Sequence, residues 1–316
     1  MDGGRILRPS KGTVAIAGGT GLIGRNLARE LQLAGYEPVI LSRSPGTTAG
    51  AVQVEYWDAE SAATLRPTLE GAQAVINLCG SPVNVRWTER NRRLITDSRV
   101  IPTEAIGLAI SDCEFPPKVW VNASAVGIYG DSGDLEISEA SAPGHGFLAQ
   151  SCAEWEAAMN PFVLPQTRKV VLRIGPVLSV GGGMLPELLK ITRAFLGGTV
   201  GNGRQYLSWI HILDLARLFE FALELSGFQG VMNATAPHPV TNAMFMEELR
   251  RATHRPWVPP APEGVIRLLA KLKGVEPELL LDGQRVVPQI AVGHGFEFRF
   301  STLRQALNDL LHQHAH

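Results

Sequence analysis

Three glycines near the start of the chain have the spacing and the setting of a phosphate-binding turn. Gly18, Gly21 and Gly24 recur at every third position between a short apolar run and a helical pattern. A pyrophosphate needs backbone N–H groups that point at it and no side chain in its way, and the N-terminus of the following helix adds roughly half a positive charge. The turn therefore predicts a dinucleotide site, although a tight glycine turn without a ligand is the alternative. The residues expected to contact the dinucleotide here are Gly18, Thr20, Gly21, Leu22, Ile23 and Gly24.

The residues that end the second apolar run indicate which dinucleotide binds. The side chain that reaches the adenosine ribose stands about 20 residues after such a turn, and this chain has Ser42 and Arg43 there instead of an acidic residue. A guanidinium pairs with a ribose 2′-phosphate through charge-assisted hydrogen bonds of about 1.5–3 kcal/mol each. We therefore predict NADP(H) rather than NAD(H), with the alternative that Arg43 is a solvated loop residue. Asp58 either accepts a hydrogen bond from the adenine amino group or holds a turn.

Two more segments follow predicted strands and are candidates for the rest of the cofactor site. Leu78, Cys79 and Gly80 follow one apolar run, and Ser124 follows the next. Ligands of open parallel sheets bind at the carboxyl ends of the strands, so we expect these residues to flank the ribose and the nicotinamide. Cys79 is interpreted as a small buried residue rather than a reactive thiol, because free cysteines usually pack.

The elements that must position these residues alternate along the first half of the chain. Apolar runs at 14–17, 39–41, 74–78, 119–123 and 170–174 are separated by helical patterns, an order typical of a parallel sheet buried on both faces. The predicted fold is α/β, a Rossmann-type doubly wound parallel sheet with a smaller C-terminal substrate lobe. Residues 11–180 are assigned to the NADP-binding domain, with strands added from 205–240, and residues 181–316 to the lobe, with helices at 184–196, 243–252 and 303–311.

Composition excludes several classes of partner. The chain has 29 basic and 30 acidic residues and a net charge of -1, which is no field for nucleic acid or an anionic membrane. No apolar run approaches the length of a membrane span or a signal peptide. The cysteines are odd in number and match no ligand pattern, so we expect reduced thiols in a cytoplasmic protein. No metal site is predicted, and the alternating histidines at the terminus are interpreted as a frayed tail: His312, His314 and His316.

The chain resembles the atypical extended short-chain dehydrogenase/reductases, in the family described as nucleotide-sugar epimerase-like, over nearly its whole length. The motifs that carry the resemblance are the glycine turn, Ser42-Arg43, Trp57-Asp58, 77–80, Arg86-Trp87, 97–99, 122–130, 201–205, 208–216 and 233–237. Residues 279–288 with Gly295-Phe296 resemble the small C-terminal domain of unknown function found in this family, at about 255–316. The resemblance implies an NADP-binding fold in which the cofactor is lined by Ser42, Arg43, Leu78, Cys79, Arg99 and Val177. A surface ion pair is the alternative for Arg99.

The chain departs from the superfamily at its catalytic pair. Active members use Tyr-x-x-x-Lys, in which the tyrosine moves a proton while the nicotinamide moves a hydride. The corresponding window has Leu148 with Cys152, or Phe147 with Ser151 if it is shifted by one residue. Neither pair can carry out that proton transfer, so ordinary alcohol and ketone chemistry is in doubt.

Other acids and bases remain as candidates. Ser124 resembles the catalytic serine or threonine of the superfamily, and Tyr129 is either a proton donor or a packing residue. His145 and His211 are the titratable side chains near the predicted cleft, and His211 has the alternative of a structural role. Asp214 fits the N-cap of a helix better than a catalytic base.

These residues lead to one functional hypothesis and two rivals. We expect an NADP(H)-dependent oxidoreductase or epimerase-like enzyme that holds a small polar substrate at 201–211, with substrate contacts from Trp209, His211, Gln205 and Arg86. One rival is a sensor or scaffold that binds NADP(H) without catalysis. The other is a redox-neutral epimerase of sugar nucleotides, for which Arg204 and Arg173 are candidate diphosphate ligands. The sequence leaves monomer and homodimer open.

Overall fold

The fold is built on one seven-stranded sheet, seen here in a computed structural model that describes residues 10–44 and 52–312. The strand order is β11-β7-β5-β4-β1-β2-β3, and every neighbouring pair is parallel. The order reverses between β1 and β4, which places the end of β1 at the point where open α/β sheets bind ligands. The strands of this sheet are β1 Thr13–Ala17, β2 Glu37–Ser42, β3 Gln53–Tyr56, β4 Ala74–Asn77, β5 Val119–Ala125, β7 Arg168–Ile174 and β11 Gly230–Ala234.

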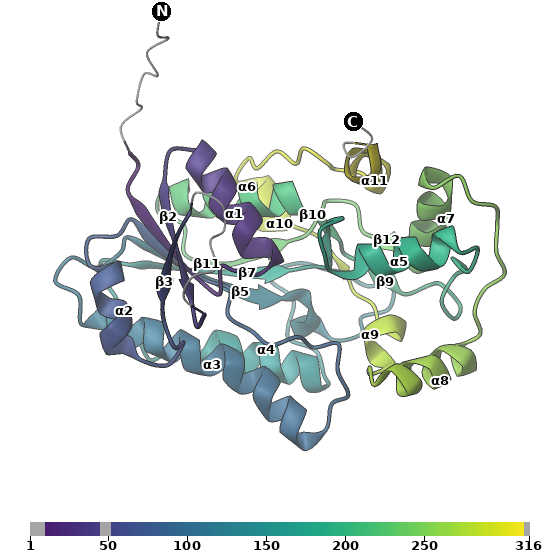
Figure 1. Cartoon of the computed structure of the whole chain (residues 1–316), viewed down its shortest axis with the longest axis horizontal. Helices are drawn as coiled ribbons and strands as arrows, with labels where there is room; N and C mark the ends of the chain where they lie inside the picture. The colour runs from purple at the N-terminus through teal and green to yellow at the C-terminus, as the bar shows by residue number, and fades with distance from the viewer. Residues whose placement is uncertain (1–9, 45–51, 313–316) are drawn as a thin grey trace, which may run out of the picture.

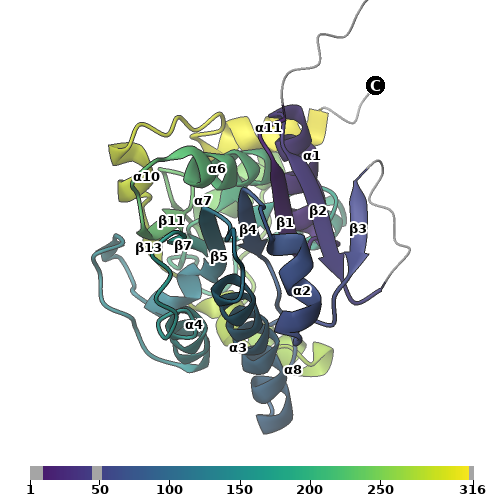
Figure 2. The same cartoon turned by 90° about the vertical axis from the view of Figure 1, so that its left-hand side faces the viewer.

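Helices cover both faces of the sheet (Figures 1 and 2). Helices α1 and α6 pack against each other on one face, and α2, α3 and α4 lie on the other. The α-helices are α1 Leu22–Leu33, α2 Ala62–Leu69, α3 Glu89–Ser111, α4 Phe147–Ala157, α5 Met184–Arg193, α6 Ile212–Glu224, α7 Asn242–Ala252, α8 Glu263–Lys273, α9 Glu278–Leu281, α10 Gln289–Gly293 and α11 Leu303–His312. The smaller elements are η1 Val126–Tyr129, β6 Glu136–Ile137, β8 Val177–Leu178, β9 Tyr206–Leu207, β10 Ile210–His211, β12 Val240–Thr241 and β13 Arg285–Val286.

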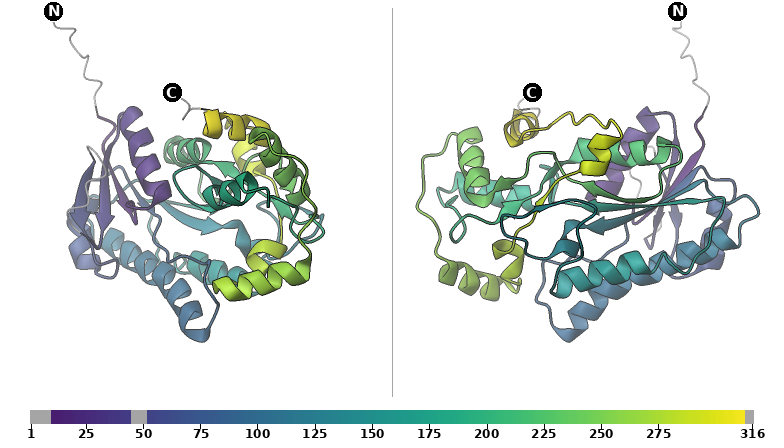
Figure 3. Two further views of the ribbon diagram at one scale, coloured as in Figure 1. Left: turned by 45° about the vertical axis from the view of Figure 1, so that its right-hand side comes forward. Right: turned by 180° about the vertical axis from the view of Figure 1, so that it is seen from behind.

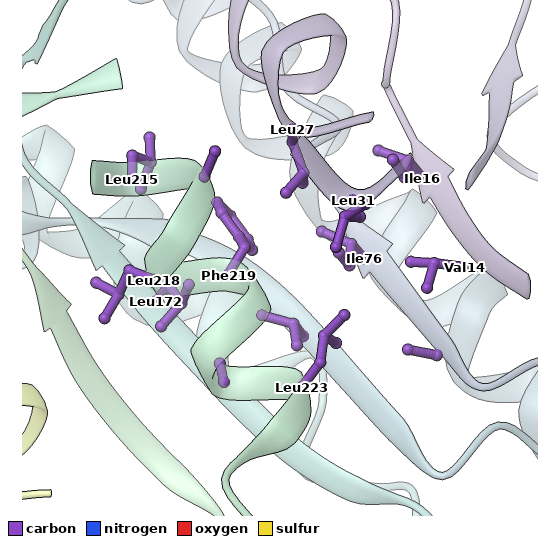
Figure 4. Close-up of a cluster of buried hydrophobic side chains, with 14 of the residues drawn as sticks. Val14, Ile16, Leu27, Leu31, Ile76, Leu172, Leu215, Leu218, Phe219 and Leu223 are labelled. Carbon is purple, nitrogen blue, oxygen red and sulfur yellow. The ribbon is translucent and has the colours of Figure 1, made fainter. Parts of the chain in front are cut away.

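The continuous apolar runs predicted for the central strands are explained by burial on both faces. Val14 and Ile16 of β1 join the core beneath α1 and α6, which is shown in Figure 4. Ala15 and Ala17 point the other way and join the core beneath α2 and α3. Because side chains alternate along a strand, an apolar residue at every position is what a sheet covered on both faces requires. The predicted parallel α/β fold is confirmed.

The strand β3 was not predicted from the sequence. It is short and lies at the edge of the sheet, with both termini of Gln53–Tyr56 exposed, so its residues carry no apolar pattern. Edge strands that are half exposed lose the signal that identifies buried strands. The strand β3 is therefore revealed by the fold and not by the sequence.

A second core lies at the carboxyl ends of the strands, where α5, α7 and α11 gather on the right of Figure 1. Trp209, Phe245 and Leu307 are buried in it. The C-terminal segment then returns to the main sheet, where α10 packs against the edge strand β11, and β13 pairs with β6 in a separate two-stranded sheet. Figure 3 shows this return from two further sides, with the last segments in yellow-green and yellow.

Neither a membrane-spanning helix nor a metal-binding cluster is found among the described residues. Within 10–44 and 52–312 no helix has the length and hydrophobicity that crossing a membrane requires. The same residues contain no cluster of three or more His, Cys, Asp or Glu side chains that could hold a metal ion. His314 and His316 of the terminal histidine pattern lie outside the described residues.

Candidate functional site

The three spaced glycines of the turn are required for different reasons. Gly18 has φ +71°, and a Cβ there would lie 2.9 Å from the carbonyl carbon of Leu78. At Gly24 a Cβ would lie 2.4 Å from the Cα of Gly19, so this glycine lets α1 pack on the turn. At Gly21 the nearest atom is 3.7 Å away and φ is -72°. Neither the backbone conformation nor a close contact requires a glycine at position 21. Gly21 lines a cavity, and the missing side chain leaves space open to that cavity.

A cavity of about 640 Å³ extends from this turn along the ends of β1, β2 and β4. Gly21 also caps α1 without a side-chain hydrogen bond, which leaves the first amide groups of the helix for a ligand. The residues that line the cavity are Gly18, Thr20, Gly21, 41–44, 57–60, 78–82, Leu94, Asp97, Ser98, Ile101 and Pro102. Of the predicted cofactor residues, Leu22, Ile23 and Val177 pack against the hydrophobic cores instead of lining this cavity.

At the end of β2, one cation is found among the described residues that line the cavity. Arg43 is exposed and lines the cavity beside Ser42, and it forms no ion pair with any residue in the described ranges. Asp58 lines the same cavity and holds a turn. Its Oδ1 accepts hydrogen bonds from the amides of Glu60 (2.9 Å) and Ser61 (2.8 Å). These backbone hydrogen bonds lower the pKa of Asp58.

A half-buried arginine, Arg99, lies against Gly80 and Ser81, two residues that line this cavity. Arg99 donates to the carbonyls of Ile95 (2.7 Å) and Ser81 (3.0 Å) and lies over the ring of Trp155. A Cβ on Gly80 would lie 3.1 Å from its guanidinium carbon. The alternative of a surface ion pair for Arg99 is therefore wrong: no carboxylate pairs with it among residues 10–44 and 52–312.

Burial raises the pKa of Cys79 to about 12, so this residue is a neutral thiol.

A second cavity of about 540 Å³ lies beyond the ends of β5 and β7. Helix α4 supplies one wall through Phe147, Leu148, Ser151 and Cys152. These residues correspond to the Tyr-x-x-x-Lys window of the sequence analysis, and they line the cavity. Burial raises the pKa of Cys152 to about 11, so its neutral thiol cannot replace a lysine ammonium group.

Ser124 and Tyr129 were predicted as catalytic residues, but neither lines either cavity. The Ser124 hydroxyl donates to Glu156 Oε1 (2.7 Å), and the Tyr129 hydroxyl donates to Asn233 Oδ1 (2.8 Å). Arg173 joins the two pairs: it donates to both oxygens of Glu156 at 2.8 Å and to the Tyr129 hydroxyl at 2.9 Å. The five side chains form one largely buried network, so both hydroxyl groups are engaged in it and neither reaches a cavity in this structure.

The charges of this network are fixed by their pairing. Burial lowers the pKa of Arg173, but the hydrogen bonds and the charge of Glu156 outweigh it and raise that pKa above its usual value. Burial raises the pKa of Tyr129, against the hydrogen bond and charge of Arg173. Tyr129 is therefore held as a neutral phenol within this network.

His211 and Trp209 were predicted to contact substrate, but they are 1% and 0% exposed and line neither cavity. His211 is the N-cap of α6, where its Nδ1 accepts from the amide of Leu213 (3.1 Å), and its ring lies 3.9 Å from that of Phe300. The predicted cap, Asp214, is instead inside the first turn and accepts from the amide of Phe300. In this structure the C-terminal segment covers His211, and its imidazole serves as a structural cap, the alternative that the sequence left open.

Burial also sets the ionisation of His211. Desolvation, with a smaller contribution from the charge of Arg299, lowers its pKa to about 4, although Asp309 Oδ2 lies 3.4 Å from its Nε2. The unfolded chain takes up a proton near pH 6.5 and the folded chain does not, so stability falls as the pH drops from 6.5 toward 4. We expect the free energy of unfolding to drop by about 2 kcal/mol more in the native chain than in His211→Asn between pH 7 and pH 5.

Urea denaturation at the two pH values measures this difference. Asparagine keeps a capping side chain, so the comparison isolates the titration. His145→Asn is the matched control, because His145 is exposed and its replacement should leave the pH dependence of the native chain unchanged. An equal pH dependence of native chain and His211→Asn would contradict the assignment.

Two other predicted substrate residues lie outside the cavities. Arg86 is exposed, and Gln205 donates to the carbonyls of Val200 and Leu280, both at 3.1 Å. Neither residue lines either cavity, whereas their neighbours Trp87 and Tyr206 line the second. In both motifs the residue that lines the cavity is the one next to the residue predicted from the sequence.

Sequence reasoning missed the acidic side of the second cavity. Glu276, Glu278 and Asp282 of the C-terminal segment line it, and Glu276 accepts from the amide of Trp87 (2.6 Å). Asp282 lies in the 279–288 motif, but none of the three carboxylates follows a predicted strand, so no local signal assigns them to a cavity. His145, which was considered with His211, is the one imidazole among the residues that line this cavity.

The sheet, the glycine turn and the cavity at the strand ends define a Rossmann-type α/β protein, and comparison with known families identifies the family. The model of the NAD dependent epimerase/dehydratase family matches residues 14–234, and a domain of unknown function, DUF1731, matches residues 261–310. The chain belongs to the NAD dependent epimerase/dehydratase family. The predicted resemblance, with its C-terminal domain, is confirmed.

Particular relatives align over almost the full chain. It is 38% identical over 298 residues to the epimerase family protein Mb2239 of Mycobacterium bovis, covering 93% of this chain and 96% of that one. The crystal structure of human epimerase family protein SDR39U1 (isoform 2) with NADPH has a TM-score of 0.85 and 33% identity, covering 95% and 99% of the chains. A nucleoside-diphosphate sugar epimerase of Corynebacterium glutamicum has a TM-score of 0.77 and 31% identity, covering 96% of this chain and 58% of that one.

Proposed function

We propose that the chain binds NADP(H) in the first cavity and acts as an oxidoreductase or epimerase-like enzyme on a small molecule in the second. The observation that carries the cofactor assignment is Arg43, an exposed guanidinium at the end of β2 that lines the first cavity and forms no ion pair within the described part of the chain. The similar human protein was crystallised with NADPH, which supports the same preference.

The residues present fit the cofactor at several points. The open space at Gly21 and the uncapped first turn of α1 suit a pyrophosphate, and Ser42 with Arg43 suits a 2′-phosphorylated ribose. Gly80, which lines the first cavity, and Arg99, which lines the second, are neighbours and would hold the middle of the cofactor between the two cavities. When bound, a nicotinamide supplies or accepts a hydride. Under this proposal residues 11–180 hold the cofactor and residues 181–316 help to enclose the substrate.

The glycine turn provides a test of that fit. We expect Gly24→Ala to lower the free energy of unfolding by about 1–3 kcal/mol, because its Cβ would overlap Gly19 and overpacking costs about that much. Gly21→Ala should cost less than about 1 kcal/mol but should weaken NADPH binding, because the new methyl group occupies space at the phosphates. Urea denaturation and a fluorescence titration of NADPH measure both quantities. Unchanged NADPH affinity in Gly21→Ala would contradict the proposed phosphate position.

The test of the proposed function is a binding titration with NADPH, NADP, NADH and NAD, followed by a screen of metabolites read as nicotinamide absorbance. NADPH should bind at least about tenfold more tightly than NADH. Equal affinity for NADPH and NADH would overturn the cofactor assignment. Turnover of any screened compound would establish the enzyme.

A sensor or scaffold that binds NADP(H) without turnover is the second candidate. It is favoured by the absence of a Tyr/Lys pair on the α4 wall and by the engagement of Ser124 and Tyr129 in the buried network. NADPH binding that is tight, together with no turnover across the screen, would favour this candidate.

A further inference from the structure

The second cavity indicates the chemical class of its ligand. We propose that it binds a compound with an uncharged apolar ring rather than a nucleoside diphosphate sugar; this rests on the proposed function, in which this cavity is the substrate site. The sequence predicts a small polar substrate next to residues 201–211. The walls of the cavity argue for a different ligand.

Apolar and aromatic side chains form most of the lining. Trp87 and Phe147 lie with their ring centroids 5.1 Å apart, and Leu148 follows on the same helix. The apolar and aromatic residues that line the cavity are Val83, Trp87, Ile95, Ala125, Val126, Phe147, Leu148, Ala149, Cys152, Trp155, Ile174, Pro176, Met184, Tyr206, Leu207 and Leu279. The volume of about 540 Å³ suits a small ligand, and pockets of this kind bind ring systems through their apolar area.

The charges in the cavity oppose a diphosphate. Three carboxylates line it, from Glu276, Glu278 and Asp282, against the two guanidinium groups of Arg92 and Arg99. A diphosphate would add negative charge to a site with this excess of carboxylates, where like charges repel.

Both cations of the cavity are already engaged. Arg92 Nε donates to the Trp87 carbonyl (3.0 Å), and its guanidinium lies over the Phe147 ring. Arg99 donates to two backbone carbonyls, Ile95 and Ser81. These contacts hold the two guanidinium groups against aromatic rings and backbone carbonyls. They are therefore not arranged to bind a diphosphate between them.

The two arginines that sequence reasoning offered as diphosphate ligands are also not available. Arg173 is buried in its bidentate pair with Glu156, and Arg204 is exposed; neither lines the cavity. The site therefore lacks the phosphate-binding geometry that a sugar nucleotide requires.

The test is a binding measurement on the full chain, with and without saturating NADPH. The probes are 4-phenylbutan-2-one, an uncharged aromatic ketone, and UDP-glucose, each titrated by calorimetry and by the fluorescence of Trp87 and Trp155. Leu148→Arg places a cation in the cavity, and Leu108→Arg is its matched control, because Leu108 lies on α3, is 53% exposed and lines neither cavity. Circular dichroism verifies that both variants fold.

We expect the ketone to bind and Leu148→Arg to weaken it by at least about tenfold, with no change in Leu108→Arg and no UDP-glucose binding to the native chain. Phe147→Ala, a second variant that removes a ring, should also weaken the ketone. Binding of UDP-glucose that exceeds that of the ketone, no ketone binding, or ketone binding that Leu148→Arg leaves unchanged would each overturn the inference. The separate NADPH titration decides the cofactor proposal, so the two failures are distinguishable.

Discussion

Replacing Arg43 with glutamate is expected to weaken NADPH binding by about a hundredfold while changing NADH binding little. One or two charge-assisted hydrogen bonds to the 2′-phosphate would be lost, at about 1.5–3 kcal/mol each, and every 1.4 kcal/mol is about tenfold in affinity. A carboxylate at the same position would also repel the phosphate. Arg43 is exposed and has no ion pair among the residues that the structure describes, so its replacement should leave the fold intact.

Fluorescence titration of both cofactors measures this effect, and urea denaturation verifies the fold. Arg29→Glu is the matched control: Arg29 is an exposed arginine on α1 that lines neither cavity, and it makes the same change in net charge. A loss of NADPH affinity that is equal in both variants would reflect net charge alone. Unchanged affinity in Arg43→Glu would show that the cofactor assignment is wrong.

The largest effect on stability is expected from Glu156→Leu. The substitution removes the carboxylate from a pair in which the side chains of Arg173 and Glu156 are 9% and 15% exposed. An uncompensated buried charge costs about 3–5 kcal/mol, and the hydroxyl of Ser124 also loses its acceptor. We expect the free energy of unfolding, measured in urea, to fall by that amount.

Two comparisons keep this prediction testable even if the single variant does not fold. The double variant Glu156→Leu with Arg173→Met replaces both charges by apolar groups and should recover most of the lost stability, because such replacements of whole pairs are often neutral. Glu154→Leu changes an exposed glutamate of the same helix and should cost less than about 0.5 kcal/mol. A double variant no more stable than Glu156→Leu would show that the pair is not the cause.

The positions of the main strands and of the cofactor turn follow from local features of the sequence. Val14 and Ile16 are buried on one face of β1 while Ala15 and Ala17 are buried on the other, and such a run identifies a doubly covered strand without any tertiary information. The glycines of the turn are equally local, because the backbone of one strand and one helix sets their geometry. Arg43 follows from its distance along the chain after that turn.

The identity of the residues that face the substrate was decided by the tertiary structure. Ser124 and Tyr129 are turned away from the cavity by Glu156, Arg173 and Asn233, which come from three other elements.

His211 is covered by Phe300 of the C-terminal segment, and the same segment brings Glu276 against Trp87. Where a side chain points depends on the partners that satisfy its polar atoms and bury its surface. Partners more than 80 positions away along the chain leave no trace in the local pattern. The sequence by itself therefore determined the buried strands and the glycine turn, while tertiary packing decided the edge strand β3 and the walls of the second cavity.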